Sequence, residues 1–172
     1  MDYFIKTKAI ACILFCLSIG KGILSSDTVS SASISEFLTN NNKSILDEDE
    51  DNSDWIELWN SSGEEGHLGG YHLTDDPQNL TKWTIPPANF NDEGYLLIFA
   101  SGKDKKDPQS ELHTNFRLNA SGGYLALVMP DGLTIASEFS NYPEQFEDVS
   151  FGEGYAEPQN ISLLQEGSQA KW

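Results

Sequence analysis

The chain of 172 residues contains only two cysteines, Cys12 and Cys16, and both lie in an apolar segment near the N-terminus. If this segment is removed on export, the mature protein has no thiol. Thiol chemistry is then excluded, and no disulfide framework can stabilise the fold. A hydrophobic core must therefore supply the stability.

Positive charge is also scarce. Lysine and arginine together number 10, against 27 aspartates and glutamates, which gives a formal net charge of −17. Such a surface repels phosphate backbones and anionic membranes and attracts divalent cations and basic partners. We therefore expect no nucleic acid among its partners.

Catalytic motifs are missing as well. The only histidines are His67, His72 and His113, and they show neither a His-x-His nor a His-Glu-x-x-His spacing. His67 and His72 are five positions apart, so an ideal strand places them on opposite faces. No Gly-x-Ser-x-Gly nucleophile elbow occurs. We predict that the protein is not an enzyme.

The N-terminus has the pattern of a secretory signal peptide. Lys6 and Lys8 precede an apolar run at 9–20, which is shorter than the roughly 20 residues that a membrane-spanning helix needs. The alternative is a short membrane anchor or a buried helix. We predict a signal peptide and leader at 1–26 and a Ser-rich spacer at 27–32. The mature protein is then secreted or held at the cell envelope or surface, with no membrane span after cleavage.

The rest of the chain has the alternation of short β-strands and no convincing amphipathic helix. Turn residues recur every eight to twelve positions, as is typical of an all-β sandwich or barrel. About eight strands are predicted, and a last segment at 149–152 can close the sheet. The predicted strands are 34–38, 55–59, 68–73, 82–87, 94–100, 112–118, 124–129 and 133–139. The segments 94–100 and 124–129 are apolar on both faces, which predicts strands that are covered on both sides. Between them, 101–111 is a charged, lysine-containing loop.

Several of these segments together resemble the bacterial lamin-tail domain. The matching pieces occur in the order of that family and cover roughly 33–153. They are ISEF at 34–37, DWIELWN at 54–60, LGGYHLTD at 68–75, WTIP at 83–86, GYLLIFASG at 94–102, HTNF at 113–116, GYLAL at 123–127, PDG at 130–132 and DVSFG at 148–152.

The resemblance implies an immunoglobulin-like β-sandwich at 33–153, followed by a polar tail or truncated linker at 154–172. Bacterial members resemble non-catalytic parts of large secreted or surface proteins. The animal relatives follow the rod of nuclear lamins. This chain differs from them, because it has no rod heptads, has a predicted leader and is strongly acidic. We therefore expect a monomeric binding or scaffold module whose partner is a protein or polysaccharide at the cell surface.

An acidic tract precedes the second predicted strand. Asp47, Asp49 and Asp51 alternate along it, and Asp54 and Glu57 follow. Ca²⁺ prefers six to eight oxygen ligands, and an Asp-x-Asp-x-Asp run can wrap such a cation. We therefore name these five residues as a candidate calcium site that would stabilise the domain. The alternative is a solvated acidic turn, and for Glu57 a structural role on the face of Trp55 and Trp59.

The aromatic residues leave a second function open. Trp55, Trp59 and Trp83 lie in predicted strands, where aromatic side chains are usually core. If they form an exposed platform instead, the protein is a carbohydrate- or matrix-binding accessory module of a larger secreted enzyme. A sugar-binding module should expose coplanar aromatic rings, whereas a scaffold should bury its tryptophans.

Overall fold

The computed structural model describes residues 31–152, apart from residue 64. The predicted signal peptide and leader at 1–26, residues 27–30 of the spacer and the tail at 154–172 lie outside these residues. The described residues form nine strands and no helix, so none of their segments is a helix that could cross a membrane. The strands are β1 (Ala32–Leu38), β2 (Trp55–Asn60), β3 (His72–Thr74), β4 (Trp83–Thr84), β5 (Tyr95–Phe99), β6 (Leu112–His113), β7 (Gly123–Val128), β8 (Ile135–Tyr142) and β9 (Phe151–Gly152).

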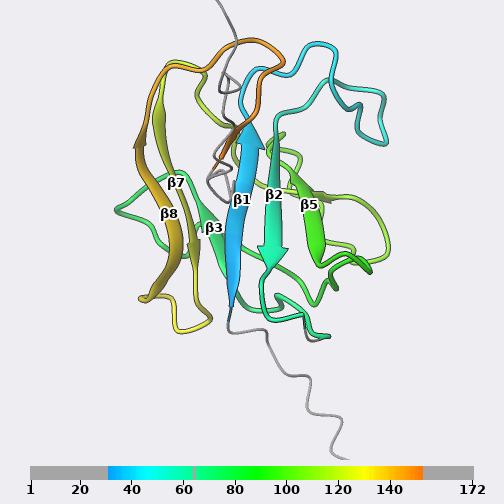
Figure 1. The fold of residues 1–172 in the computed structure, drawn as a ribbon, viewed down its shortest axis with the longest axis vertical. Helices are drawn as coiled ribbons and strands as arrows, with labels where there is room; N and C mark the ends of the chain where they lie inside the picture. Colours follow the sequence, from blue (N-terminus) through cyan, green and yellow to red (C-terminus); the bar gives the residue numbers. More distant parts are fainter. Residues whose placement is uncertain (1–30, 64, 153–172) are drawn as a thin grey trace, which may run out of the picture.

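The strands form two sheets, which confirms the predicted all-β class and is consistent with a β-sandwich. One sheet has the order β6-β5-β2-β1-β9 and the other β4-β3-β7-β8. Neighbours are antiparallel except for β5 and β6, which are parallel. Figure 1 shows β1, β2 and β5 side by side, with β7 and β8 in the other layer.

Strand β2 explains how the sequence divides its side chains between two apolar clusters. Ile56 and Leu58 are fully buried in the core that both sheets share. Trp55 points to the opposite face, because successive strand residues alternate. There it packs with Leu38 and Phe99 in a second cluster on the outside of the five-stranded sheet.

The two strands predicted to be covered on both sides differ in the structure. In β7, all four residues from Leu125 to Val128 are buried. In β5, Ile98 and Phe99 are buried, whereas Tyr95, Leu96 and Leu97 are only half-buried. The reason is that β6 pairs only with Ile98 and Phe99. The prediction therefore holds for β7 and for the C-terminal part of β5.

Three predicted strands are much shorter than expected. Of 82–87 only Trp83 and Thr84 form β4. Of 68–73 only its last two residues belong to β3, and Gly70 has a φ of +90° that interrupts the extended chain. Of 112–118 only Leu112 and His113 form β6. Just beyond them, the Thr114 hydroxyl donates to the Phe116 carbonyl at 2.7 Å. This local hydrogen bond replaces ladder pairing, as threonine side chains often do.

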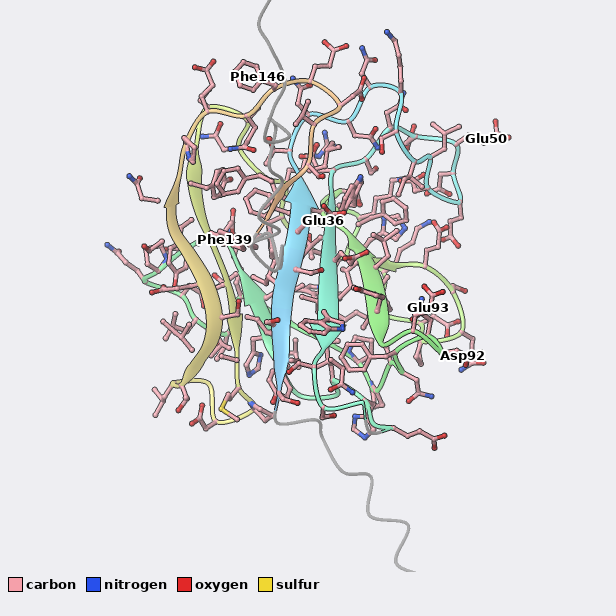
Figure 2. All side chains as sticks on the ribbon, viewed as in Figure 1. Glu36, Glu50, Asp92, Glu93, Phe139 and Phe146 are labelled. Carbon is pink, nitrogen blue, oxygen red and sulfur yellow. The ribbon has the colours of Figure 1, made fainter. Side chains whose placement is uncertain are left out.

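Aromatic packing closes the side of the sandwich where β1 meets β8. The Phe37 ring lies 5.2 Å from Phe139, 4.9 Å from Tyr142 and 5.7 Å from Phe151, measured between centroids. Phe139 lies in the space between β8 and β1 in Figure 2. The first and last described strands are thereby joined to the second sheet.

Two loops meet at one end of the molecule, the upper end in Figure 1. One is the β1–β2 loop, residues 39–54, which contains the acidic tract. The other is the β8–β9 loop, residues 143–150. The amide of Asp148 donates to the carbonyl of Asn40 at 3.0 Å and joins the two loops.

Candidate functional site

The acidic tract is folded around one buried carboxylate. Asp47 Oδ1 accepts the backbone N–H groups of Asp49 and Asp51 at 3.0 and 3.1 Å. Its Oδ2 accepts the hydroxyl of Ser53 at 2.7 Å. The backbone closes the same turn, because the amide of Glu50 donates to the carbonyl of Asp47 at 2.8 Å. The tract is therefore an ordered turn rather than a freely solvated run of charge.

A lysine from a distant loop lies against the three alternating aspartates. One carboxylate oxygen from each of Asp47, Asp49 and Asp51 lies within 4.8 Å of the others. The Lys103 ammonium is 2.7 Å from Asp47, 2.8 Å from Asp49 and 2.9 Å from Asp51. The cation that the alternating carboxylates hold is thus supplied by the protein itself. We call Lys103 and these three aspartates the lysine clamp.

A second lysine strengthens the same contact between loops. Lys105 Nζ lies 2.7 Å from both Glu48 and Asp49. The amide of Glu48 also donates to the carboxylate of Glu111. The β1–β2 loop is therefore attached to residues 101–111 by charged hydrogen bonds, which are stronger than neutral ones.

The electrostatics of the clamp follow from these contacts. Burial alone would raise the pKa of Asp47. Hydrogen bonds from Lys103, Ser53 and the backbone of Asp51 and Asp49 outweigh burial and hold this pKa well below its usual value. Burial would lower the pKa of Lys103, but its three carboxylate partners raise it. Both groups are therefore charged at neutral pH.

The other two predicted calcium ligands lie outside this group. The Asp54 carboxylate accepts backbone hydrogen bonds from Asn41 and Leu118, and burial raises its pKa to about 6. Glu57 accepts the hydroxyl of Ser35 at 2.6 Å. Of the five residues proposed from the sequence, the fold gathers Asp47, Asp49 and Asp51 and gives Asp54 and Glu57 separate structural partners.

As folded, the clamp fits an ammonium group better than Ca²⁺. Ca²⁺ needs about six to eight oxygens near 2.4 Å. Both oxygens of Asp47 already accept hydrogen bonds, and Lys103 Nζ lies at the point where the three carboxylates converge. A divalent ion would have to displace this lysine.

Lys103 and Lys105 are the site residues that the sequence reasoning missed. The signal was present, because an alternating Lys-x-Lys pair stands in the charged loop 101–111 and matches the alternating aspartates. What the sequence could not show is that these loops, more than fifty positions apart, meet in space. The pairing of β2 with β5 brings them together, because the two loops flank those strands.

The histidines make separate structural contacts. His113 and Ser101 are both buried, with 2.8 Å between His113 Nδ1 and Ser101 Oγ. Burial lowers the pKa of His113, and its ring stacks on Phe99 with centroids 5.3 Å apart. His67 Nδ1 accepts the amide of Gly69, and His72 pairs with Thr84. The Ser101–His113 pair has the residue types of a nucleophile and base, but it lies inside the fold.

Two of the tryptophans in strands are buried, as expected for a scaffold, and the third is partly exposed beside another aromatic ring, as expected for a sugar-binding module. Trp55 and Trp83 are buried, with 6% and 0% of their surface exposed. Trp59 is half-buried and stacks with Tyr95, with centroids 6.5 Å apart and ring planes 22° from parallel. This aromatic pair lies on the outer face of the five-stranded sheet, where Glu57 also lies, two positions along β2.

Compared with protein-family models and with curated proteins, the chain shows no significant match to either.

Proposed function

We propose that this protein is a non-catalytic extracellular or cell-surface binding and scaffold module, an immunoglobulin-like sandwich of lamin-tail type. The observation that carries the proposal is the two-layer all-β fold, in which several of the pieces that resemble the family coincide with strands of the two sheets. DWIELWN contains β2, GYLLIFASG contains β5, GYLAL lies in β7, and DVSFG ends in β9. These pieces supply both layers of the sandwich.

The use of the polar side chains supports a non-catalytic role. Several charged and polar side chains that could take part in catalysis are ion-paired or hydrogen-bonded to one another. Examples are the lysine clamp, the Ser101–His113 pair and the Ser35–Glu57 hydrogen bond. Each of these contacts joins two separate segments of the chain. Such side chains hold loops in position, which is what a scaffold that presents a binding surface requires.

The predicted leader at 1–26 and the charge of −17 support a location outside the cell. The experiment follows the epitope-tagged full chain in intact cells that are treated with an added protease. We expect the tag to be digested without cell lysis. A second chain that lacks residues 1–26 should be protected. Protection of the full chain would contradict the proposed location.

A carbohydrate-binding function is the second candidate, and the Trp59–Tyr95 pair favours it. Near-parallel aromatic rings offer flat apolar area to the C–H faces of a sugar. A shallow groove of about 540 Å³ lies beside Leu97, two residues from Tyr95 on the same face of β5. Asn89, Gln109 and Glu111 line it and offer hydrogen-bonding groups.

Affinity electrophoresis in gels that contain neutral polysaccharides tests this candidate. A sugar-binding module is retarded, and Trp59→Ala and Tyr95→Ala remove the retardation. Phe146→Ser, a change at a distant exposed aromatic residue, is the matched control. If no gel retards the wild type, the carbohydrate-binding function is excluded and the scaffold function remains.

A further inference from the structure

Four large apolar side chains are exposed on the two loops that meet at the upper end of the sandwich. Ile45 and Leu46 lie in the β1–β2 loop and are 42% and 53% exposed. Phe146 and Val149 lie in the β8–β9 loop and are 78% and 53% exposed. Phe146 projects from the top of the molecule in Figure 2. We call these four residues the apolar end.

The loops that carry the apolar end are fixed to one another. Asp148 Oδ1 accepts the backbone N–H groups of Asn42 and Lys43 at 2.7 and 2.8 Å. Glu147 Oε1 accepts the side-chain amide of Asn42 at 2.8 Å. Asp148 itself has a φ of +57°, a strained conformation for a residue other than glycine. The apolar side chains are therefore presented on a pre-organised surface, so that binding would cost little loop entropy.

The surroundings of the apolar end are acidic. The β1–β2 loop carries the tract 47–51, in which Glu50 is exposed and directed outward in Figure 2. The β8–β9 loop carries Glu144, Glu147 and Asp148. Lys43 is the only basic residue within the two loops, 39–54 and 143–150. An exposed apolar patch with a charged rim is the usual character of a protein-binding site.

The negative charge around the apolar end limits which kinds of partner can bind there. Anionic lipid headgroups and nucleic acids are repelled by the acidic rim, and so is a second copy of a chain with a net charge of −17. A polypeptide that places apolar side chains between lysines or arginines complements both properties.

We propose that the apolar end docks a basic polypeptide segment of a partner protein, with Phe146 as the central anchor. Leu46 and Val149 contact the apolar side chains of the segment, and Glu144 and Glu147, which flank Phe146 in the β8–β9 loop and are exposed, face its cations. This inference rests on the proposed binding function and adds the surface and the chemistry of the partner. Aromatic anchors usually carry much of the binding energy at such a surface.

The test uses the full chain and short fluorescent peptides, with binding measured by fluorescence anisotropy at physiological salt. One peptide alternates lysine and leucine, a second replaces each leucine by serine, and a third replaces each lysine by glutamate. We expect only the lysine–leucine peptide to bind. Phe146→Ser and Leu46→Ser should each weaken its binding about tenfold or more, with an unchanged melting temperature because both side chains are exposed.

Leu133→Ser is the matched control, because Leu133 is also 78% exposed but lies in the β7–β8 turn at the opposite end of the sandwich. Its affinity should equal that of the wild type. An equal loss in this variant would mean that any exposed apolar side chain contributes, and equal binding of the lysine–serine peptide would mean general charge attraction. Either result would overturn the proposal. Dimers in sedimentation that Phe146→Ser abolishes, or binding to phosphatidylcholine vesicles, would also overturn it. None of these outcomes depends on where the cell places the chain, so the proposed location stands or fails separately.

Discussion

At the scale of single residues, the lysine clamp changes the meaning of the acidic tract. The sequence offers a cation site or a solvated turn, and the structure contains an ion cluster made by the chain itself. Asp47 has a fully buried side chain, whereas Asp49 and Asp51 are largely exposed. Only the contact with Asp47 is shielded from water, so this one pair should dominate the energy of the clamp.

Replacing Lys103 by methionine should lower the free energy of unfolding by about 2–3 kcal/mol, because the buried Asp47 loses its counter-charge. Denaturant titration at neutral pH measures this loss. Lys106→Met is the control, because Lys106 and Asp104 form an exposed pair that should be worth only a few tenths of a kcal/mol. Equal losses in both variants would show that the clamp has no special role.

Asp54 makes the free energy of unfolding depend on pH in the opposite direction to the lysine clamp. Burial raises its pKa from 3.8 to about 6, so folding favours the protonated form. The stability that this group contributes is complete below pH 3.8 and is lost as the pH rises through 6. Asp54→Asn should therefore raise the free energy of unfolding at pH 8 by about 1–2 kcal/mol, a value reduced for solvent screening.

The measurement for Asp54 is denaturant unfolding of wild type and Asp54→Asn at pH 4 and pH 8. The difference between the two proteins should be present at pH 8 and nearly absent at pH 4. A difference of the same size at both values would assign the effect to packing instead. The pKa values of Asp49 and Asp148 are lowered by hydrogen bonds, so their contributions are lost as the pH falls and run against that of Asp54.

At the scale of elements, alternation in the sequence predicts the position of every strand but not its length. Strand β2 has the predicted faces, because Ile56 and Leu58 are fully buried in the shared core, whereas Glu57 and Trp59, on the other face with Trp55, are only half-buried. Strands β3 and β6 are shorter than predicted, because a left-handed glycine and a threonine hydrogen bond end the extended chain. Both are local effects that compete with the backbone hydrogen bonds between strands, and the hydrophobic pattern of the sequence does not reveal them.

Asp148 allows a matched pair of substitutions that tests how the upper loops are held. Asp148→Gly keeps the positive φ available but removes the acceptor of the Asn42 and Lys43 amides. Asp148→Asn keeps both an acceptor and tolerance of this conformation. We expect Asp148→Gly to lower the free energy of unfolding and Asp148→Asn to lower it much less, because only the glycine variant leaves the two amides without their acceptor.

Amide hydrogen exchange of Asn42 and Lys43 reports the effect of the Asp148 variants directly. Exchange at both amides should accelerate in Asp148→Gly and stay close to wild type in Asp148→Asn. The lysine–leucine peptide should also bind more weakly to Asp148→Gly, because the apolar end is then no longer pre-organised. Unchanged exchange in the glycine variant would show that other contacts hold the loops.

At the scale of the whole molecule, net charge works against the compact fold. A charge of −17 on a chain of 172 residues repels itself most strongly at low ionic strength. The composition predicts this excess directly. The composition does not predict that Lys103 and Lys105 contact the acidic β1–β2 loop. Their position there depends on the pairing of β2 with β5.

Salt and calcium can be separated in one thermal unfolding experiment. We expect the melting temperature to rise with NaCl, because counterions screen the repulsion. At matched ionic strength, Ca²⁺ and EDTA should give wild type the same melting temperature, since Lys103 fills the clamp. In Lys103→Met, Ca²⁺ should recover part of the lost stability. A clear gain for the wild type in Ca²⁺ would mean that calcium displaces Lys103.

The pairing of β1 with β9 also sets the order in which the chain can fold. Glu36 lies opposite Gly152 and Phe37 opposite Phe151, so the outer edge of β1 is covered by a strand that is synthesised more than a hundred residues later. Until then β1 presents an open edge that another chain could pair with. Contacts of such long sequence separation are slow to form. The last of the described strands to be made is therefore the one that completes the five-stranded sheet.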